Sequence, residues 1–166
     1  MIAAQGGLAL AFALALLGAR QHGFALALVA AEAVAVAVTG LLRGAWPGAL
    51  LVLLLNAALL PMVLRQRPPA GGVRRSVAPW AVVGVGCGLA LLAQGVDTDG
   101  VPLAVMLLGI LLTAAHRQRA MQVVGLLAMQ NGIALAGLAQ DGVMQLVCLL
   151  PIIPGLAGAT LLMRRA

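Results

Sequence analysis

The sequence predicts an all-α integral membrane protein with seven transmembrane helices. Of its 166 residues, 63% are hydrophobic and only 8% are charged, and the mean hydropathy is +1.12. A water-soluble domain of this size needs far more charge to cover its surface. Because a helix of about 20 apolar residues spans a bilayer, seven spans use nearly the whole chain. We therefore expect a single transmembrane domain, 1–166, with any large reaction centre on another polypeptide.

The predicted spans are separated by short turns that contain glycine, arginine or acidic residues. The N-terminal stretch lacks a charged leader, so we interpret it as the first span rather than a cleaved signal. The fifth span is the shortest. The ranges, uncertain by about two to four residues at each end, are 2–19, 23–42, 46–64, 77–94, 101–115, 120–139 and 143–163.

The arginines predict the orientation of these spans. All ten basic residues are arginine, and the net charge is +6. In a soluble protein this charge would suggest nucleic acid, but here the arginines end apolar spans, so we expect contact with lipid and none with nucleic acid. With the N-terminus outside and the C-terminus in the cytoplasm, Arg43 is the one arginine on the outer side and the other nine are on the inner side. This distribution agrees with the positive-inside rule. The acidic residues Asp97, Asp99 and Asp141 also fall on the outer side. The expected location is a multi-pass position in the cell (inner) membrane.

Two layouts within the chain resemble each other. At an offset of 97 residues, Arg20-Gln21 matches Arg117-Gln118, and Gly40-Leu41 matches Gly137-Leu138. Spans 1–3 and 5–7 would then be parallel repeats joined by span 4. Chance similarity among helices rich in Ala, Leu and Val is the alternative.

Small residues at helix-packing spacing predict close contacts between helices. Gly84 and Gly88 form a GxxxG step in the fourth span. Gly125 and Gly132 belong to a narrow stripe on the sixth span, together with Ala128 and Ala136.

Four polar side chains fall near the middle of apolar spans: Glu32, Asn56, Gln130 and Asn131. A charge at the centre of a membrane helix costs about 2.5–3.5 kcal/mol, so Glu32 is expected to be protonated or paired. One interpretation is a hydrated pocket through which a proton or ion passes. The other is a set of hydrogen bonds between helices, each worth about 1 kcal/mol. We favour the ion path for Glu32 and the structural role for the three amides.

No cofactor or metal site is expected in this chain. Cys87 and Cys148 lie inside apolar spans without CxxC spacing, so they are interpreted as small buried hydrophobes. His22 and His116 fall at the predicted inner interface and are interpreted as neighbours of the lipid headgroups. No nucleophile triad or phosphate-binding loop is present in the sequence.

The chain resembles component E of hydrogenase-4 in its layout and in the span that begins at Arg117, RQRAMQVVGLLAMQNGIALAG. Its last three spans are similar to the small three-helix subunit of respiratory complex I. In that family the segment around Gly125–Gly132 usually reads like GxxxMENG, with Glu where this chain has Gln130. The family also tends to carry a lysine at a place that looks like Asn56. The resemblance implies a membrane subunit of a group 4 hydrogenase or formate hydrogenlyase-like complex, seated beside antiporter-like subunits that pass protons, with metal centres on partner subunits.

Both departures replace a titratable group by an amide, which cannot change charge. The resulting hypothesis is an accessory, non-catalytic membrane-arm subunit that connects antiporter-like subunits and has a degenerate ion path. One alternative is a small secondary transporter that uses Glu32 as its coupling carboxylate. The other is a purely structural or assembly protein of the membrane.

Overall fold

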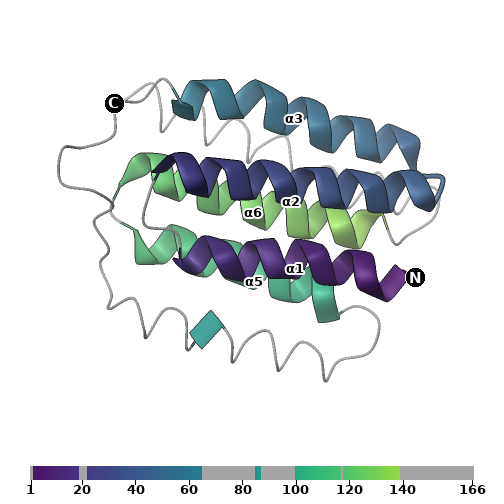
Figure 1. Cartoon of the computed structure of the whole chain (residues 1–166), viewed down its shortest axis with the longest axis horizontal. Coiled ribbons are helices and arrows are strands. Elements are labelled where there is room, and N and C mark those ends of the chain that lie inside the picture. Colours follow the sequence, from purple (N-terminus) through teal and green to yellow (C-terminus); the bar gives the residue numbers. More distant parts are fainter. Residues whose placement is uncertain (1, 19–21, 65–84, 87–99, 117, 139–166) are drawn as a thin grey trace.

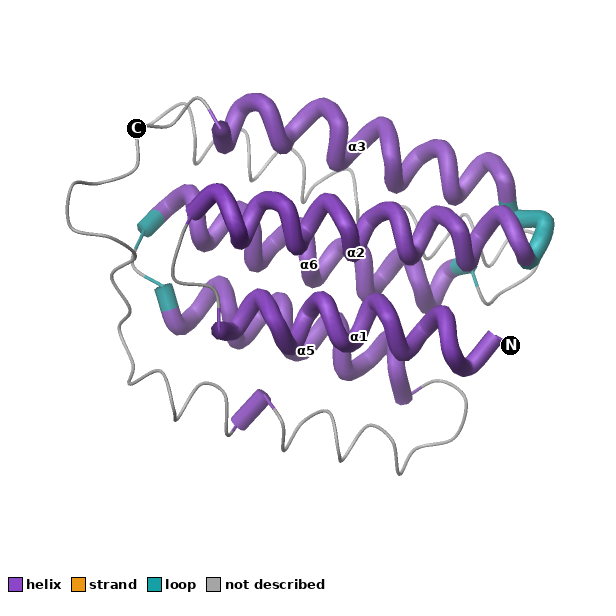
Figure 2. The backbone as a smooth tube through the Cα atoms, viewed as in Figure 1, coloured by secondary structure: helices purple, strands orange, loops and turns teal. Residues whose placement is uncertain are grey.

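The computed structural model describes residues 2–18, 22–64, 85–86, 100–116 and 118–138, and this part of the chain is all-helical without a strand (Figures 1 and 2). Its helices are α1 (Ile2–Gly18), α2 (His22–Leu42), α3 (Trp46–Leu64), α5 (Gly100–Ala115) and α6 (Arg119–Gly137).

These five helices coincide with five of the predicted ranges to within two residues at either end. Of the predicted range 77–94 only 85–86 are described, and 143–163 lies outside the described residues. Gly84, Gly88 and both cysteines therefore also lie outside them.

A tight turn at Gly44 reverses the chain between α2 and α3. The amide of Gly44 donates to the carbonyl of Leu41 at 3.0 Å, and the amide of Ala45 donates to the carbonyl of Gly40 at 2.9 Å. This is the Schellman pattern of helix ends, which needs a left-handed residue after the helix. Gly44 supplies it with a φ of 76°, because glycine adopts positive φ at little cost.

The helices form two layers that face each other (Figure 1). One layer holds α1, α2 and α3 in that order, and the other holds α5 and α6. Helix α1 packs on α5 and α2 packs on α6, while α3 packs mainly on α2 and has a smaller contact with α6. The consecutive helices α2 and α3 therefore share one interior with α6, which comes from a distant part of the chain.

The first two helices of the proposed repeats run in the same directions. Figure 1 shows α1 parallel to α5 and α2 parallel to α6. Near the ends of the last pair, a Cβ added at Gly40 would lie 3.0 Å from the Leu138 side chain. The contact joins residues 98 apart, close to the offset of 97 in the sequence, so corresponding parts of α2 and α6 lie at the same height. The third helix of the second repeat lies outside the described residues, and the repeat itself stays a prediction.

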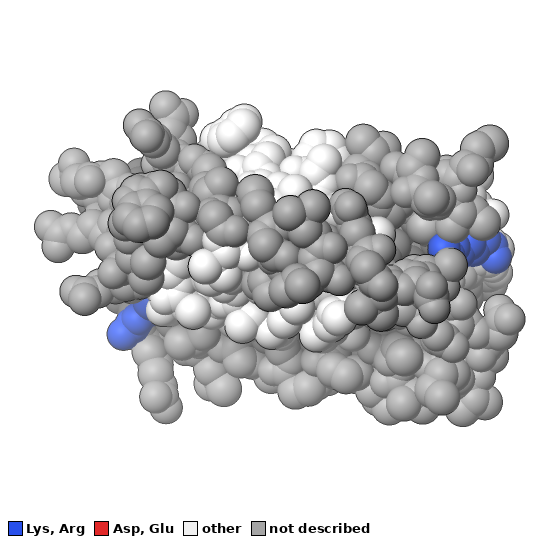
Figure 3. Space-filling model, turned by 90° about the horizontal axis from the view of Figure 1, so that it is seen from below, with Lys and Arg blue, Asp and Glu red and all other residues white. Residues whose placement is uncertain are grey.

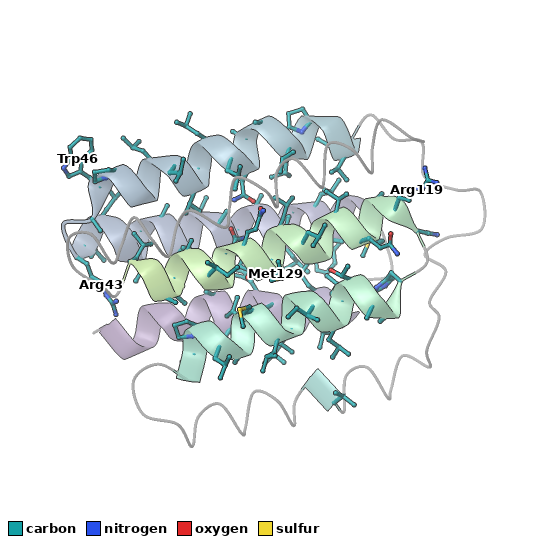
Figure 4. All side chains as sticks on the ribbon, turned by 180° about the vertical axis from the view of Figure 1, so that it is seen from behind. Arg43, Trp46, Arg119 and Met129 are labelled. Carbon is teal, nitrogen blue, oxygen red and sulfur yellow. The ribbon has the colours of Figure 1, made fainter. Side chains whose placement is uncertain are left out.

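Apolar side chains cover both the inside and much of the outside of the described bundle. The interior is built from leucine, valine and alanine, and large apolar residues such as Val34, Leu50 and Leu54 are exposed. Two stretches, Gly23–Leu42 and Arg119–Gly137, are long and apolar enough to cross a membrane. The described arginines, Arg43 and Arg119, lie at opposite ends of the bundle (Figures 3 and 4).

Candidate functional site

The predicted polar side chains are all inside the bundle. Glu32 on α2, Asn56 on α3, and Gln130 and Asn131 on α6 are each at most 3% exposed. Apolar helices that hide amides and a carboxyl while exposing leucine and valine reverse the usual distribution of a soluble domain. The packing of α2, α3 and α6 brings together three of these residues, Glu32, Asn56 and Asn131, which we call the polar centre.

One hydrogen bond in the polar centre joins helices that are far apart in the sequence. Asn56 Nδ2 donates to Asn131 Oδ1 at 3.1 Å and also to the carbonyl of Val52, one turn earlier on α3, at 2.9 Å. The first bond fixes α3 against α6. The second fixes the direction in which the Asn56 side chain leaves its helix.

Asn131 also faces the carboxyl of Glu32. Its side chain lies within hydrogen-bonding range of the carboxyl, yet among the described residues neither carboxyl oxygen nor Asn131 Nδ2 has a partner at full hydrogen-bond distance and angle. The side chain of Asn131 on α6 therefore interacts with a polar residue of α2 and with one of α3.

Gln130 is as deeply buried as Asn131. Successive residues project about 100° apart around an α-helix, so Gln130 leaves α6 in a different direction from Asn131. The sequence placed both amides at one depth, but it could not say which of them points toward α2 and α3.

A second polar group connects α5 to the start of α6. Gln122 Nε2 donates to the carbonyl of His116 at 3.1 Å, and the hydroxyl of Thr113 donates to the carbonyls of Gly109 and Gln122 at 2.9 and 3.4 Å. Sequence reasoning missed Thr113 and Gln122. Their signal is a pair of hydrogen-bonding residues on either side of a short turn between apolar helices.

His116 does not lie exposed beside the headgroups, as its position at a span end predicted. Its side chain is 1% exposed, and Nδ1 shares a hydrogen bond of 2.9 Å with the carbonyl of Leu112. The reason is local, because the imidazole folds back onto the last turn of α5 and α6 starts directly beside it. The side chain of His22 lies outside the described residues.

Glycines bring α5 and α6 to backbone contact. A Cβ added at Gly125 would lie 2.6 Å from the Thr113 amide nitrogen, and one at Gly132 would lie 2.5 Å from that of Met106. Gly109 on α5 meets the backbone of Met129 in the same way, and Met129 lies near the middle of α6 (Figure 4). These antiparallel contacts place the two stripe glycines on the face that meets α5.

No group of three or more His, Cys, Asp or Glu that could hold a metal ion occurs among the described residues. The polar centre contains one carboxyl and two amides, so it offers hydrogen bonds and one exchangeable carboxyl proton. It holds neither a nucleophile nor a base beside one. No family model, curated protein or solved structure matches the chain.

Proposed function

We propose that this chain is a non-catalytic, multi-pass subunit of the cell (inner) membrane that connects antiporter-like subunits in a complex I-like or group 4 hydrogenase-like oxidoreductase. In this proposal seven helices cross the bilayer, with the N-terminus outside and the C-terminus in the cytoplasm. The resemblance of the span around Gly125–Gly132 supplies the class of complex, and redox metals belong to its other subunits.

The hydrogen bond between Asn56 and Asn131 carries the connector role. Asn56 stands where the resembled family tends to hold a lysine, and the preceding neighbour of Asn131, Gln130, stands where that family holds a glutamate. An amide neither gains nor loses a proton at physiological pH. Here the amide nitrogen of Asn56 donates hydrogen bonds to Asn131 on α6 and to the carbonyl of Val52 on its own helix. In this proposal these bonds fix the spacing of α3 and α6 and do not relay charge.

The outside of the described bundle fits a place among lipids and apolar neighbours. Exposed leucines and valines occupy α2 and α3 between the ends marked by Arg43 and Arg119. Trp46 is 62% exposed and lies at the same end of the bundle as Arg43 (Figure 4). Tryptophan at this level is typical of the interface between bilayer and water.

Purification in mild detergent tests this proposal against the transporter. A C-terminally tagged chain, expressed from its native locus, is expected to bring down large antiporter-like subunits and a metal-containing oxidoreductase module, identified by mass spectrometry. The isolated chain in liposomes is expected to move no protons in response to an imposed pH gradient.

The opposite pair of results would overturn the connector. A chain that purifies without large partners and dissipates the gradient in liposomes is a transporter. The Glu32→Gln variant is the matched control in that case, because loss of transport in it would identify the coupling carboxylate.

A further inference from the structure

Four buried polar atoms of the polar centre have no hydrogen-bond partner in the described part of the chain. They are both carboxyl oxygens of Glu32, Oδ1 of Asn56 and Nδ2 of Asn131. Buried polar atoms in proteins are almost always paired, and an unpaired one costs as much as a lost hydrogen bond. These four atoms surround the hydrogen bond between Asn56 and Asn131. We therefore infer that the hydrogen bonds of the polar centre are incomplete unless the carboxyl carries a proton.

The lack of a basic residue near Glu32 in the described helices also favours a protonated carboxyl. Glu32 is fully buried and is the one acidic side chain in the described residues. The described arginines lie at the two ends of the bundle, away from α2's midpoint (Figure 4). A carboxylate in such a place is far from any compensating charge that the described helices provide, and an isolated buried charge is strongly unfavourable.

A neutral carboxylic acid has one O–H donor and one carbonyl acceptor. Each asparagine amide likewise offers at least one donor and one acceptor. With the Asn56-to-Asn131 bond already made, the remaining atoms form two complementary pairs: Asn131 Nδ2 with one Glu32 oxygen, and the Glu32 O–H with Asn56 Oδ1. The four unpaired atoms are the ones that these two bonds use.

We propose that Glu32 is held as a neutral acid in a closed hydrogen-bonded ring with Asn56 and Asn131, which ties α2, α3 and α6 together. In this ring Asn56 donates a hydrogen bond to Asn131, Asn131 donates one to Glu32, and the O–H of Glu32 donates one to Oδ1 of Asn56, directly or through one water. The ring is a binding site for a single proton. It is independent of which complex the chain belongs to.

The ring explains why the carboxyl meets the amide of Asn131 rather than a basic group. A cationic partner would stabilise the carboxylate, whereas an amide pair completes the hydrogen bonds of the protonated form. Each member donates once and accepts once within the ring, so all three helices are joined in one register.

Infrared spectroscopy of the intact purified protein or its complex tests the protonation state. At neutral pH the difference spectrum of wild type minus Glu32→Gln is expected to contain the C=O stretch of a protonated carboxylic acid. Asp97, Asp99, Asp141 and the C-terminus cancel in this difference. A difference spectrum with only carboxylate bands would overturn the proposal.

The Asn56→Leu variant tests the ring itself, because it removes the acceptor of the Glu32 proton. The acid C=O band is expected to move to higher frequency in Asn56→Leu, as it does when a carboxyl loses hydrogen bonding. A band at the wild-type frequency would show that Asn56 is not a partner of Glu32.

Stability provides a readout that does not depend on spectroscopy. Glu32→Gln keeps one donor and one acceptor, so its thermal midpoint in detergent is expected to stay close to wild type. Glu32→Leu has similar volume but no polar atoms, and its midpoint is expected to fall by several degrees. A Gln variant as unstable as the Leu variant would contradict the ring, because a neutral donor and acceptor would then not suffice.

Discussion

The hydrogen bond between the side-chain amides of Asn56 and Asn131 is the clearest specific contact that holds distant helices together. In lipid, apolar side chains gain little by leaving the solvent, so association depends on packing and on hydrogen bonds between helices. A bond between residues 75 positions apart in the sequence therefore selects the neighbours of α3 in a way that its leucines do not.

A double-mutant cycle measures this bond. Asn56→Ala, Asn131→Ala and the double variant are expected to show a coupling of about 1 kcal/mol in the free energy of unfolding, because either single change already breaks the contact. Unfolding in mixed detergent, followed by circular dichroism, provides the measurement.

Thr39→Val is the matched control for that cycle. Thr39 is a buried residue of α2 whose hydroxyl donates to the carbonyl of Ala35 within the same helix at 2.8 Å. Its removal is expected to be additive with Asn56→Ala. Strict additivity of the two asparagine changes would show that their bond contributes nothing to stability.

The pairing of α5 with α6 depends on glycine at the contact. Gly125→Ala is expected to lower stability by about 1–3 kcal/mol, because its Cβ would meet the backbone of Thr113, which cannot rotate aside. Gly23→Ala on α2 is the matched control, since nothing lies within 4 Å of its added Cβ. Thermal unfolding of the two variants in the same detergent compares them, and equal stability would show that the close approach is not required.

Helix positions could be predicted from the sequence because length and hydropathy determine them locally. Helix α2 ends and α3 begins at the turn that contains Arg43 and Gly44, α5 begins at Gly100, and α6 begins at Arg119. The burial of Glu32, Asn56, Gln130 and Asn131 also follows from their place in the middle of such runs. The hydropathy pattern could not predict which helices pack on one another or through which faces.

Partner choice depends on how helices rotate about their axes, and apolar sequences carry little information on that. All sides of these helices are apolar, so neither lipid nor interior selects one face strongly. The role of Asn131 rather than Gln130, the burial of His116, and the contacts of Thr113 and Gln122 all depend on this rotation. The role of Asn131 follows from the packing of α6 on α2 and α3, whereas the burial of His116 and the contacts of Thr113 and Gln122 follow from the packing of α5 on α6.

At the scale of the whole molecule, the proposed seven spans would put the turn after α2 and the C-terminal tail on opposite sides of the membrane. Arg43 and Arg119 lie at opposite ends of the described bundle. Nine of the ten arginines then face the cytoplasm, as the positive-inside rule favours.

Cysteine labelling tests this topology. In a background with Cys87 and Cys148 replaced by alanine, Ala45→Cys is expected to react with an impermeant maleimide applied to the outside of intact spheroplasts. Ala166→Cys is expected to react only after the membrane is opened. Labelling of both positions from the same side would contradict the seven-span, N-out arrangement.

In place of the ion path that the sequence favours for Glu32, we propose that the interior of this subunit holds helices together and does not conduct protons. The most direct measurement is proton translocation per electron pair by the whole complex, reconstituted with Glu32→Gln in place of the wild-type subunit. Gln preserves the hydrogen bonds of a neutral acid but cannot release a proton, so we predict an unchanged ratio. A lower ratio in a fully assembled complex would contradict the claim and place Glu32 on the path of the translocated protons.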